Sequence, residues 1–442
     1  MAINGIVSGI NTAELMDKLV EVARGPIKQL QGKQTTLSIK KFAFQDLNTL
    51  LGNLQTMLEA VDTADEFSAF TVSSSIPTGV TATVTGAATP GTHDVSVTNL
   101  ATSTLLNSSG FAASSTALTG TSVDVRVGTG ASAVTTTVNI SSALGTDTVS
   151  GLATYINDNV SGVNSWVMDT GAATDPFIIM MEGTDTGAAN AVTASVNGVT
   201  GLSFSTPRLA VDASLTVDTI SISSASNTLT GVLPGVDLNL LNSGFGSSTL
   251  TINRDGTAMA AKVQSVVNAY NSLDAYFDSQ TGTAAGAVLS GDSTVRAVQQ
   301  KVQSTVGFDY ATGGLSGIGD LGLGTDKTAK MEFTSADFTT KLGSNFSDVM
   351  TMLTGTNGLF VKLQKEVDVI TDTTSGVVQA RIDSIDTQVE DLTTRIANAE
   401  VRLDSYRDML QKQFTNMELV LGRYQGTRKF LDQQIAQWTK QK

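Results

Sequence analysis

Apolar residues at helical spacing lie at both ends of this 442-residue chain. Asn11 followed three residues later by Glu14 is typical of a helix cap, and Gly25-Pro26 predicts that one helix ends there and another begins. The next helix carries a seam of apolar residues close to heptad spacing, namely Leu37, Phe44, Leu47, Leu51, Leu54, Leu58 and Val61. A seam of this kind predicts a partner helix.

The stretch from Val377 to Tyr424 carries a matching seam. Its apolar positions keep the same steps over many turns: Val378, Ile382, Ile385, Val389, Leu392, Ile396, Ala399, Leu403, Tyr406, Leu410, Met417, Val420 and Tyr424. One continuous helix would extend roughly 70 Å at about 1.5 Å per residue, which is long for a compact domain. We expect the two chain ends to pair lengthwise as a coiled coil or bundle; a hydrophobic core helix is the alternative.

Alternation of apolar and polar residues with a period of two marks the middle of the chain as β-rich. The segments 67–101 and 211–252 can form one sheet domain, with 102–209 inserted as a second. The expected fold class is therefore α+β and multidomain, with a helical leg from both chain ends and two nested β-rich head domains between. The predicted limits are an N-terminal export or leg segment 1–43, a helical leg domain 44–66 and 253–404, a head domain 67–101 and 210–252, an inserted tip domain 102–209, and a C-terminal leg segment 405–442.

Charge and composition exclude several classes of function. The formal net charge of -14 disfavours binding to nucleic acid or to anionic membrane surfaces. Cysteine is absent, which removes disulfides, thiolate nucleophiles and cysteine metal sites. No stretch approaches the roughly 20 apolar residues of a membrane span, and the opening residues lack the features of a signal peptide. We expect a protein that leaves the cell without a cleaved signal peptide.

Candidate catalytic and cofactor chemistry is sparse. The segment 317–322 matches a GxGxxG pattern, but turn-rich sequence follows it where a dinucleotide fingerprint requires a helix. His93 is the only histidine, and we expect it to face solvent on a strand. The carboxylates Asp383, Asp386, Glu390 and Asp391 are interpreted as a solvated helix face and not as a metal or acid–base cluster. We therefore expect no enzyme, no cofactor and no metal.

Several short motifs occur in a characteristic order along nearly the whole chain. They are Val7-Ser8-Gly9-Ile10-Asn11-Thr12, Arg24-Gly25-Pro26-Ile27, Phe67-Ser68-Ala69-Phe70, Asn227 with the segment 231–241, the segments 267–273 and 291–296, and Ile318-Gly319 before Phe333. Together they resemble the flagellar hook-associated protein 2 family, the cap of the bacterial flagellar filament. The inserted segment 102–209 carries no motif of this kind.

The resemblance implies export through the flagellar type III apparatus and assembly as a ring at the filament tip, where the cap retains exported flagellin and directs its insertion. The implied partners are further copies of the chain (a pentamer by analogy), flagellin, the hook-filament junction protein, an export chaperone at the C-terminal segment, and host mucin. Nucleic acid and a membrane span are not expected. Two alternatives stay open: another flagellar axial protein, either a flagellin or the hook-filament junction protein, and a surface adhesin that binds host glycoprotein through its β-rich middle.

The seams and the resemblance together predict the residues of the assembly surfaces. Leg and coiled-coil assembly is assigned to Phe44, Leu47, Leu51, Leu54, Leu58, Ile382, Ile385, Val389, Leu392, Ile396, Leu403, Tyr406 and Leu410. N-terminal contact with the filament or export apparatus is assigned to Leu15, Leu19 and Ile27. C-terminal contact with the filament is assigned to Phe414, Met417, Leu421 and Tyr424.

Overall fold

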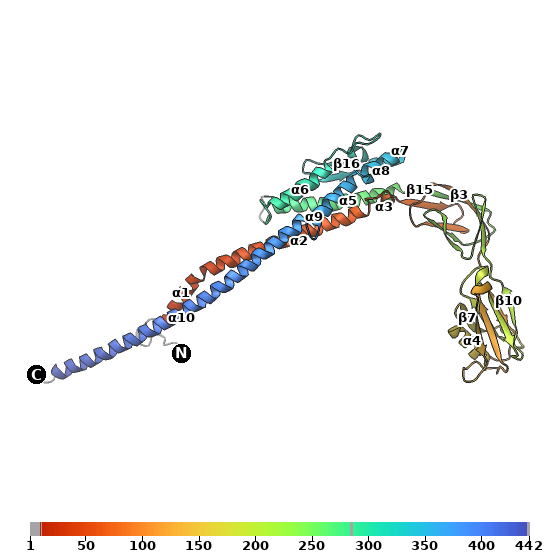
Figure 1. The fold of residues 1–442 in the computed structure, drawn as a ribbon, viewed down its shortest axis with the longest axis horizontal. Helices are drawn as coiled ribbons and strands as arrows, with labels where there is room; N and C mark the ends of the chain where they lie inside the picture. The colour runs from red at the N-terminus through yellow and green to blue at the C-terminus, as the bar shows by residue number, and fades with distance from the viewer. Residues whose placement is uncertain (1–8, 10, 283–285, 440–442) are drawn as a thin grey trace. The chain divides into compact units, whose positions relative to one another are not determined.

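The computed structural model describes residues 9, 11–282 and 286–439, and it divides into two compact units. The first unit takes the described residues up to Phe67 and those from Ala260 onward, so both chain ends contribute to it. The second unit is Ser68–Met259. Helices dominate the first unit and strands the second, which confirms the predicted fold class (Figure 1).

The first unit is a set of helices with one small β-hairpin. Its helices are α1 (Thr12–Ala23), α2 (Gly25–Glu59), α3 (Ala64–Phe67), α5 (Gly256–Thr281, from Ala260 onward), α6 (Ser293–Val306), α7 (Ser335–Ser344), α8 (Phe346–Thr354), α9 (Leu359–Thr371) and α10 (Val377–Thr439), with a 3-10 turn η3 (Ile318–Leu321). The hairpin pairs β16 (Leu323–Thr325) with β17 (Met331–Phe333). The turn η3 and this hairpin hold the GxGxxG segment, which confirms that it is a turn and opens no helix.

Local sequence signals set the helix ends in this unit. The Asn11 side chain accepts a hydrogen bond from the Glu14 backbone N–H at 3.1 Å, which caps α1 as predicted. Pro26 lies in the first turn of α2, where its missing N–H removes no helical bond. Asp292 caps α6 by accepting from the Thr294 N–H. Sequence alone therefore placed the joint between α1 and α2 correctly.

The part of the second unit formed by residues 70–99 and 213–254 consists of two antiparallel sheets around one core. A five-stranded sheet has the order β1-β15-β3-β11-β12, and a three-stranded sheet has the order β13-β14-β2. The strands are β1 (Phe70–Ser74), β2 (Val80–Val84), β3 (Gly91–Asn99), β11 (Ala213–Val217), β12 (Ile220–Ser224), β13 (Thr228–Leu233), β14 (Val236–Leu240) and β15 (Ser247–Arg254). Pro234-Gly235 turns β13 into β14, and the φ of +68° at Gly235 is one that favours glycine. The core includes Val95, Leu215, Leu238 and Leu250.

The inserted region forms two further sheets and one helix around a separate core. The first tip sheet has the order β10-β4-β8-β7 and the second tip sheet β6-β5-β9. The strands are β4 (Leu105–Ser108), β5 (Ser122–Val127), β6 (Val134–Asn139), β7 (Val163–Asp169), β8 (Phe177–Gly183), β9 (Val192–Asn197) and β10 (Phe204–Arg208), with two 3-10 turns, η1 (Gly130–Ser132) and η2 (Ala188–Asn190). Helix α4 (Val149–Asn159) buries Leu152 and Ile156 in this core. The sequence analysis did not predict α4.

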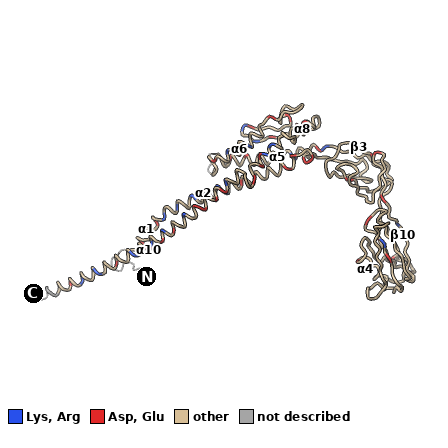
Figure 2. The backbone as a smooth tube through the Cα atoms, in the orientation of Figure 1, with Lys and Arg blue, Asp and Glu red and all other residues tan. Residues whose placement is uncertain are grey.

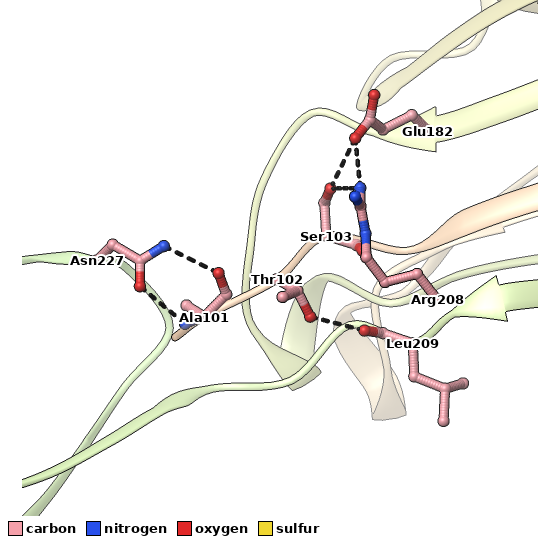
Figure 3. A network of polar contacts seen from close by, with 7 residues as sticks. All are labelled: Ala101, Thr102, Ser103, Glu182, Arg208, Leu209 and Asn227. Carbon is pink, nitrogen blue, oxygen red and sulfur yellow. Dashed lines mark hydrogen bonds and ion pairs between the residues drawn. The ribbon is translucent and has the colours of Figure 1, made fainter. Parts of the chain in front are cut away.

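Hydrogen bonds hold the two crossings between these regions together (Figure 3). The Asn227 side chain accepts from the Ala101 N–H at 2.8 Å and donates to the Ala101 carbonyl at 2.9 Å. Thr102 donates from its hydroxyl to the Leu209 carbonyl at 2.8 Å, which ties the outgoing strand to the returning one. Each region has its own core, so the nesting is as predicted, while the exact residue limits of the domains stay predictions.

Candidate assembly interface

The two chain ends pair along α2 and α10 in the first unit. The Gln34 amide donates to the Thr393 hydroxyl at 2.7 Å, and the Lys41 ammonium lies 2.6 Å from the Asp386 carboxylate. Gln34 and Lys41 are seven residues apart on α2, and their partners on α10 are seven residues apart in the opposite direction. The two helices are therefore antiparallel, and the pairing repeats every two helical turns. Helices α2 and α10 lie side by side (Figure 1), and the apolar residues predicted from sequence are buried along them.

The C-terminal part of the α2 seam also packs on α9. Because α10 begins at Val377, the antiparallel register runs out near Leu50 of α2, and α9 lies alongside the remainder. The Gln55 side-chain amide donates to the Asp368 carboxylate at 2.9 Å, and its oxygen Oε1 accepts from the Thr371 hydroxyl at 3.3 Å. Five assigned residues are completely buried along this seam: Phe44, Leu47, Leu51, Leu54 and Leu58. Sequence analysis missed α9 as a partner of this seam.

The predicted residues of α10 follow the same inward stripe. Those buried are Ile382, Ile385, Leu392, Ile396, Leu403 and Leu410, whereas Val389 and Tyr406 are half-buried. At the first turns of α2, Ile396 and Leu403 form a small cluster with Ile27, against which Val20, Ala23, Leu30 and Ala399 pack. Ile27 is only 4% exposed and packs within the chain, because the first turn of α2 faces α10. Its assignment as a contact with the filament or the export apparatus stays a prediction.

Helix α1, and α10 from Val401 onward, carry apolar side chains that remain exposed to solvent. On α1 these are Leu15, Leu19 and Val22, and Val22 is 79% exposed. On α10, Tyr424 is 71% exposed, while the assigned residues Phe414, Met417 and Leu421 are half-buried. Further exposed apolar residues on α10 are Val401, Met409, Leu419, Val420, Phe430 and Leu431. Sequence analysis missed Phe430 and Leu431 because it ended the apolar run at Tyr424, shortly before Gly426, whereas α10 continues through this glycine to Thr439.

A groove of about 840 Å³ runs beside the α2–α10 pair. Leu37 and Leu392 line it together with Gly32, and charged side chains border it, among them Lys33 and Arg395. An apolar groove of this form, between two helices and with charges at its edge, is one that a third helix can enter.

The candidate chemical groups do not converge on a reactive site. Asp386 pairs with Lys41, Asp383 accepts from Gln379, and Asp391 pairs with Arg395, which agrees with a solvated helix face. Within the described ranges, no group of three or more His, Asp or Glu residues is arranged to hold a metal ion. Likewise, no helix among the described residues has the length and apolar content to cross a membrane.

His93 is only partly exposed, so the expectation of a solvent-facing histidine needs correction. Its ring Nδ1 lies 2.7 Å from the Asp218 carboxylate, and its side chain is 25% exposed. The pairing follows from the register of β3 beside β11, which brings the turn after β11 over the strand that carries His93. The hydrogen bond with His93, helped by one from the Asp94 backbone N–H, lowers the pKa of Asp218.

Two family models match this chain, and both describe one protein. Residues 8–104 match the flagellar hook-associated protein 2 N-terminus, and residues 210–426 match the flagellar hook-associated protein 2 C-terminus. The chain belongs to the flagellar hook-associated protein 2 family. The family is that of the flagellar cap, a structural protein. The two matched ranges leave residues 105–209 of the inserted region outside both models.

Individual members of the flagellar hook-associated protein 2 family are similar over the whole length. The flagellar hook-associated protein 2 of Escherichia coli is 28% identical over 462 residues, covering 98% of this chain and 97% of that protein. The A-type flagellar hook-associated protein 2 of Pseudomonas aeruginosa is 25% identical over 460 residues, covering 96% and 95%. A crystal structure of three domains of the Escherichia coli flagellar cap protein FliD matches with a TM-score of 0.66 at 28% identity, covering 78% of this chain and 99% of that one.

Proposed function

We propose that this flagellar cap protein forms a ring at the filament tip, retains exported flagellin there and directs its insertion. The observation that carries the proposal is the pair of exposed apolar leg ends described above. Val22 on α1 and Tyr424, Phe430 and Leu431 on α10 each leave more than half of their surface in water. They contrast with the buried apolar seam along the earlier part of α10. Exposed apolar surface of this kind is typical of a contact with another protein subunit.

The leg ends would contact flagellin and neighbouring copies at once. The buried α2–α10 seam makes a stable helical pair, and the groove at Leu37 and Leu392 offers a place for a helix of the filament or of the next copy. The seam therefore supports the leg, whereas the exposed residues make contacts. We propose copies of the chain as a pentamer, flagellin and the hook-filament junction protein as partners at these surfaces.

The exposed leg residues can be tested without disturbing the buried seam. A variant with Tyr424→Ser, Phe430→Ser and Leu431→Ser should fold normally, because exposed substitutions usually change stability by about 0.5 kcal/mol or less each. Cells carrying it should have short or missing filaments and should release flagellin into the medium. The matched control is Val369→Ser, an exposed apolar residue on α9, which should leave filaments at normal length.

The proposal has a decisive negative outcome. If cells that lack this gene still build full-length filaments and keep flagellin out of the medium, the protein does not cap the filament. If the gene is needed but the triple variant behaves like the native chain, the cap works through surfaces other than the leg ends.

We propose three further properties. The protein is exported without a cleaved signal peptide, an export chaperone binds residues 405–442, and the β-rich middle binds host mucin. The first is tested by mass spectrometry of the extracellular protein. The tryptic peptide that ends at Lys18 should begin at Met1 or Ala2. A peptide that begins further along would show that a leader is removed.

A further inference from the structure

The groove beside the α2–α10 pair has the length of a short helix. Its walls are residues between Gln29 and Lys40 on α2 and between Thr387 and Arg395 on α10. At about 1.5 Å per residue, the α2 wall is roughly 16 Å long, which matches about three turns of a further helix. Its volume of about 840 Å³ leaves room for several apolar side chains of such a helix.

The polar residues that line the groove use their donors within their own helices. The hydroxyls of Thr36 and Thr387 and the side-chain amide of Gln388 each donate to the backbone carbonyl four residues earlier, at 2.9, 3.0 and 3.1 Å. A partner therefore does not have to accept hydrogen bonds from them. Together with the apolar side chains of Leu37 and Leu392, this wall favours an apolar surface over a polar ligand.

Gly32 opens the groove further. A Cβ at this position would have no atom from another part of the chain within 4 Å, so packing inside the chain does not require a glycine there. Glycine inside a helix is less favourable than any residue except proline. Its missing side chain lets a partner approach the α2 backbone closely, beside Leu37.

Unpaired lysines border the groove. Lys33 and Lys40 lie on its α2 side, seven residues apart, and among the described residues neither side chain forms an ion pair or a hydrogen bond. The groove contains one carboxylate, Asp391, which pairs with Arg395. Acidic and basic residues both occur along α2 and α10 in Figure 2, but three bases against one acid give this border an excess of two positive charges.

We propose that the groove receives an amphipathic helix of an incoming flagellin subunit, whose apolar stripe is bordered by two carboxylates seven residues apart. Seven residues correspond to about two turns, so these carboxylates would lie level with Lys33 and Lys40. An apolar side chain of the same helix would enter at Gly32. The inference rests on the proposed function, and it names the chemistry of the helix that the cap recognises.

The helices of a second copy match this groove less well. The exposed far end of α10 has three bases and no acid over residues 423–429, so it would bring positive charge to the two groove lysines. On α1, Glu14 and Glu21 are seven residues apart. However, both carboxylates already form ion pairs, with Lys18 and Lys28 of the same chain. Carboxylates that are free to meet the groove are therefore expected on a different protein.

Gly32→Leu tests the groove without weakening the leg. Because leucine favours a helix more than glycine does, the variant should melt about 2 °C above the native chain. It should nevertheless bind monomeric flagellin of the same bacterium at least tenfold more weakly in biolayer interferometry, since its side chain would occupy the groove. The matched control is Gly52→Leu, also on α2, where a Cβ is equally free and which lies outside the groove. It should gain similar stability and bind flagellin like the native chain.

Removal of the two lysines gives an independent measurement. Lys33→Gln with Lys40→Gln should lower the association rate constant for flagellin about fivefold in about 50 mM salt, and the rate should depend less on salt than that of the native chain. The matched control is Lys327→Gln with Lys330→Gln, which removes the same charge from exposed positions between β16 and β17. This control should change the rate less than twofold.

Each outcome separates the groove from the capping function. If the native chain binds flagellin and Gly32→Leu binds it equally well, the groove inference is overturned and the proposed function remains. The same holds if Gly32→Leu weakens self-association, measured by sedimentation, and not flagellin binding. Equal effects of the two lysine pairs would overturn a carboxylate-bordered helix as the occupant. If the native chain does not bind flagellin, the proposed contact between leg and flagellin fails together with this inference.

Discussion

Arg381 is the residue whose replacement tests the packing of the leg most directly. From α10, its Nε and Nη2 donate to Oδ2 of Asp292 at 3.3 and 2.8 Å, while Oδ1 of Asp292 accepts from the Thr294 N–H at 3.0 Å and caps α6. The Asp292 side chain is only 3% exposed. Arg381→Met would therefore leave a buried carboxylate that keeps its cap bond but loses its counter-charge.

The cost follows from the burial of the two partners. Removing one member of a fully buried ion pair costs about 3–5 kcal/mol. Because the Arg381 side chain is 34% exposed, water can partly replace it, and we expect Arg381→Met to lower the free energy of unfolding by about 2 kcal/mol. The matched control on the same helix is Arg395→Met, whose ion pair with Asp391 spans 3.5 Å between exposed side chains and should cost about 0.3 kcal/mol.

Urea unfolding of the full chain, followed by far-UV circular dichroism, measures this difference because the helical signal comes mainly from the first unit. Hydrogen exchange of the α6 amides should locate the loss at the helix that Asp292 caps. Adding Asp292→Asn to Arg381→Met should recover more than half of the loss, since the amide keeps the cap acceptor without a buried charge. If Arg381→Met and Arg395→Met cost the same, or the double variant recovers nothing, the buried-charge explanation is refuted.

Three further outcomes are expected. Leu51→Ala in the fully buried seam should cost about 3 kcal/mol in urea unfolding, whereas Leu419→Ala on the exposed part of α10 should cost under about 0.5 kcal/mol; similar values would contradict the seam. Asn227→Ala removes both bonds to Ala101 and should cost about 1–2 kcal/mol in unfolding followed by Trp166 fluorescence, and an unchanged midpoint would argue against this junction. Burial raises the pKa of Asp274 above its ordinary value of 3.8, although a hydrogen bond from Gln303 acts in the opposite direction. The protonated Asp274 side chain therefore contributes fully to folding stability below pH 3.8, and this contribution is lost as the pH rises through the higher pKa of the folded state. Asp274→Asn should therefore raise the urea midpoint at neutral pH but not in acid, and a gain of equal size at both would contradict the assignment.

The parts of the fold that sequence predicted are those where one spacing rule decides the outcome. The heptad steps through Phe44, Leu47 and Leu51 require an apolar partner, and Gly25-Pro26 cannot continue a helix unchanged, so both features were readable in advance. The nested β regions followed from period-two alternation in two separated segments, 67–101 and 211–252, with 102–209 between them.

The parts that sequence did not predict depend on contacts between distant residues. Helix α4 contains Gly151 and two asparagines, which favour helix poorly, and it forms because Thr148 caps it and Leu152 and Ile156 are buried in the core of the inserted region. The site was likewise only partly predictable. Spacing alone could not tell that Ile27 packs inward and Leu15 does not, because both lie on amphipathic helices and the choice depends on where α10 passes.

The pairing of α2 with α10 also determines when the leg can fold. The hydrogen bond between Gln34 and Thr393 joins residues 359 positions apart in the chain. Closing so long a loop is entropically costly and slow, and α10 cannot form until the residues from Val377 onward are available. A chain that passed through a narrow conduit with its N-terminus leading would thus be unable to complete its own leg until the trailing end emerged.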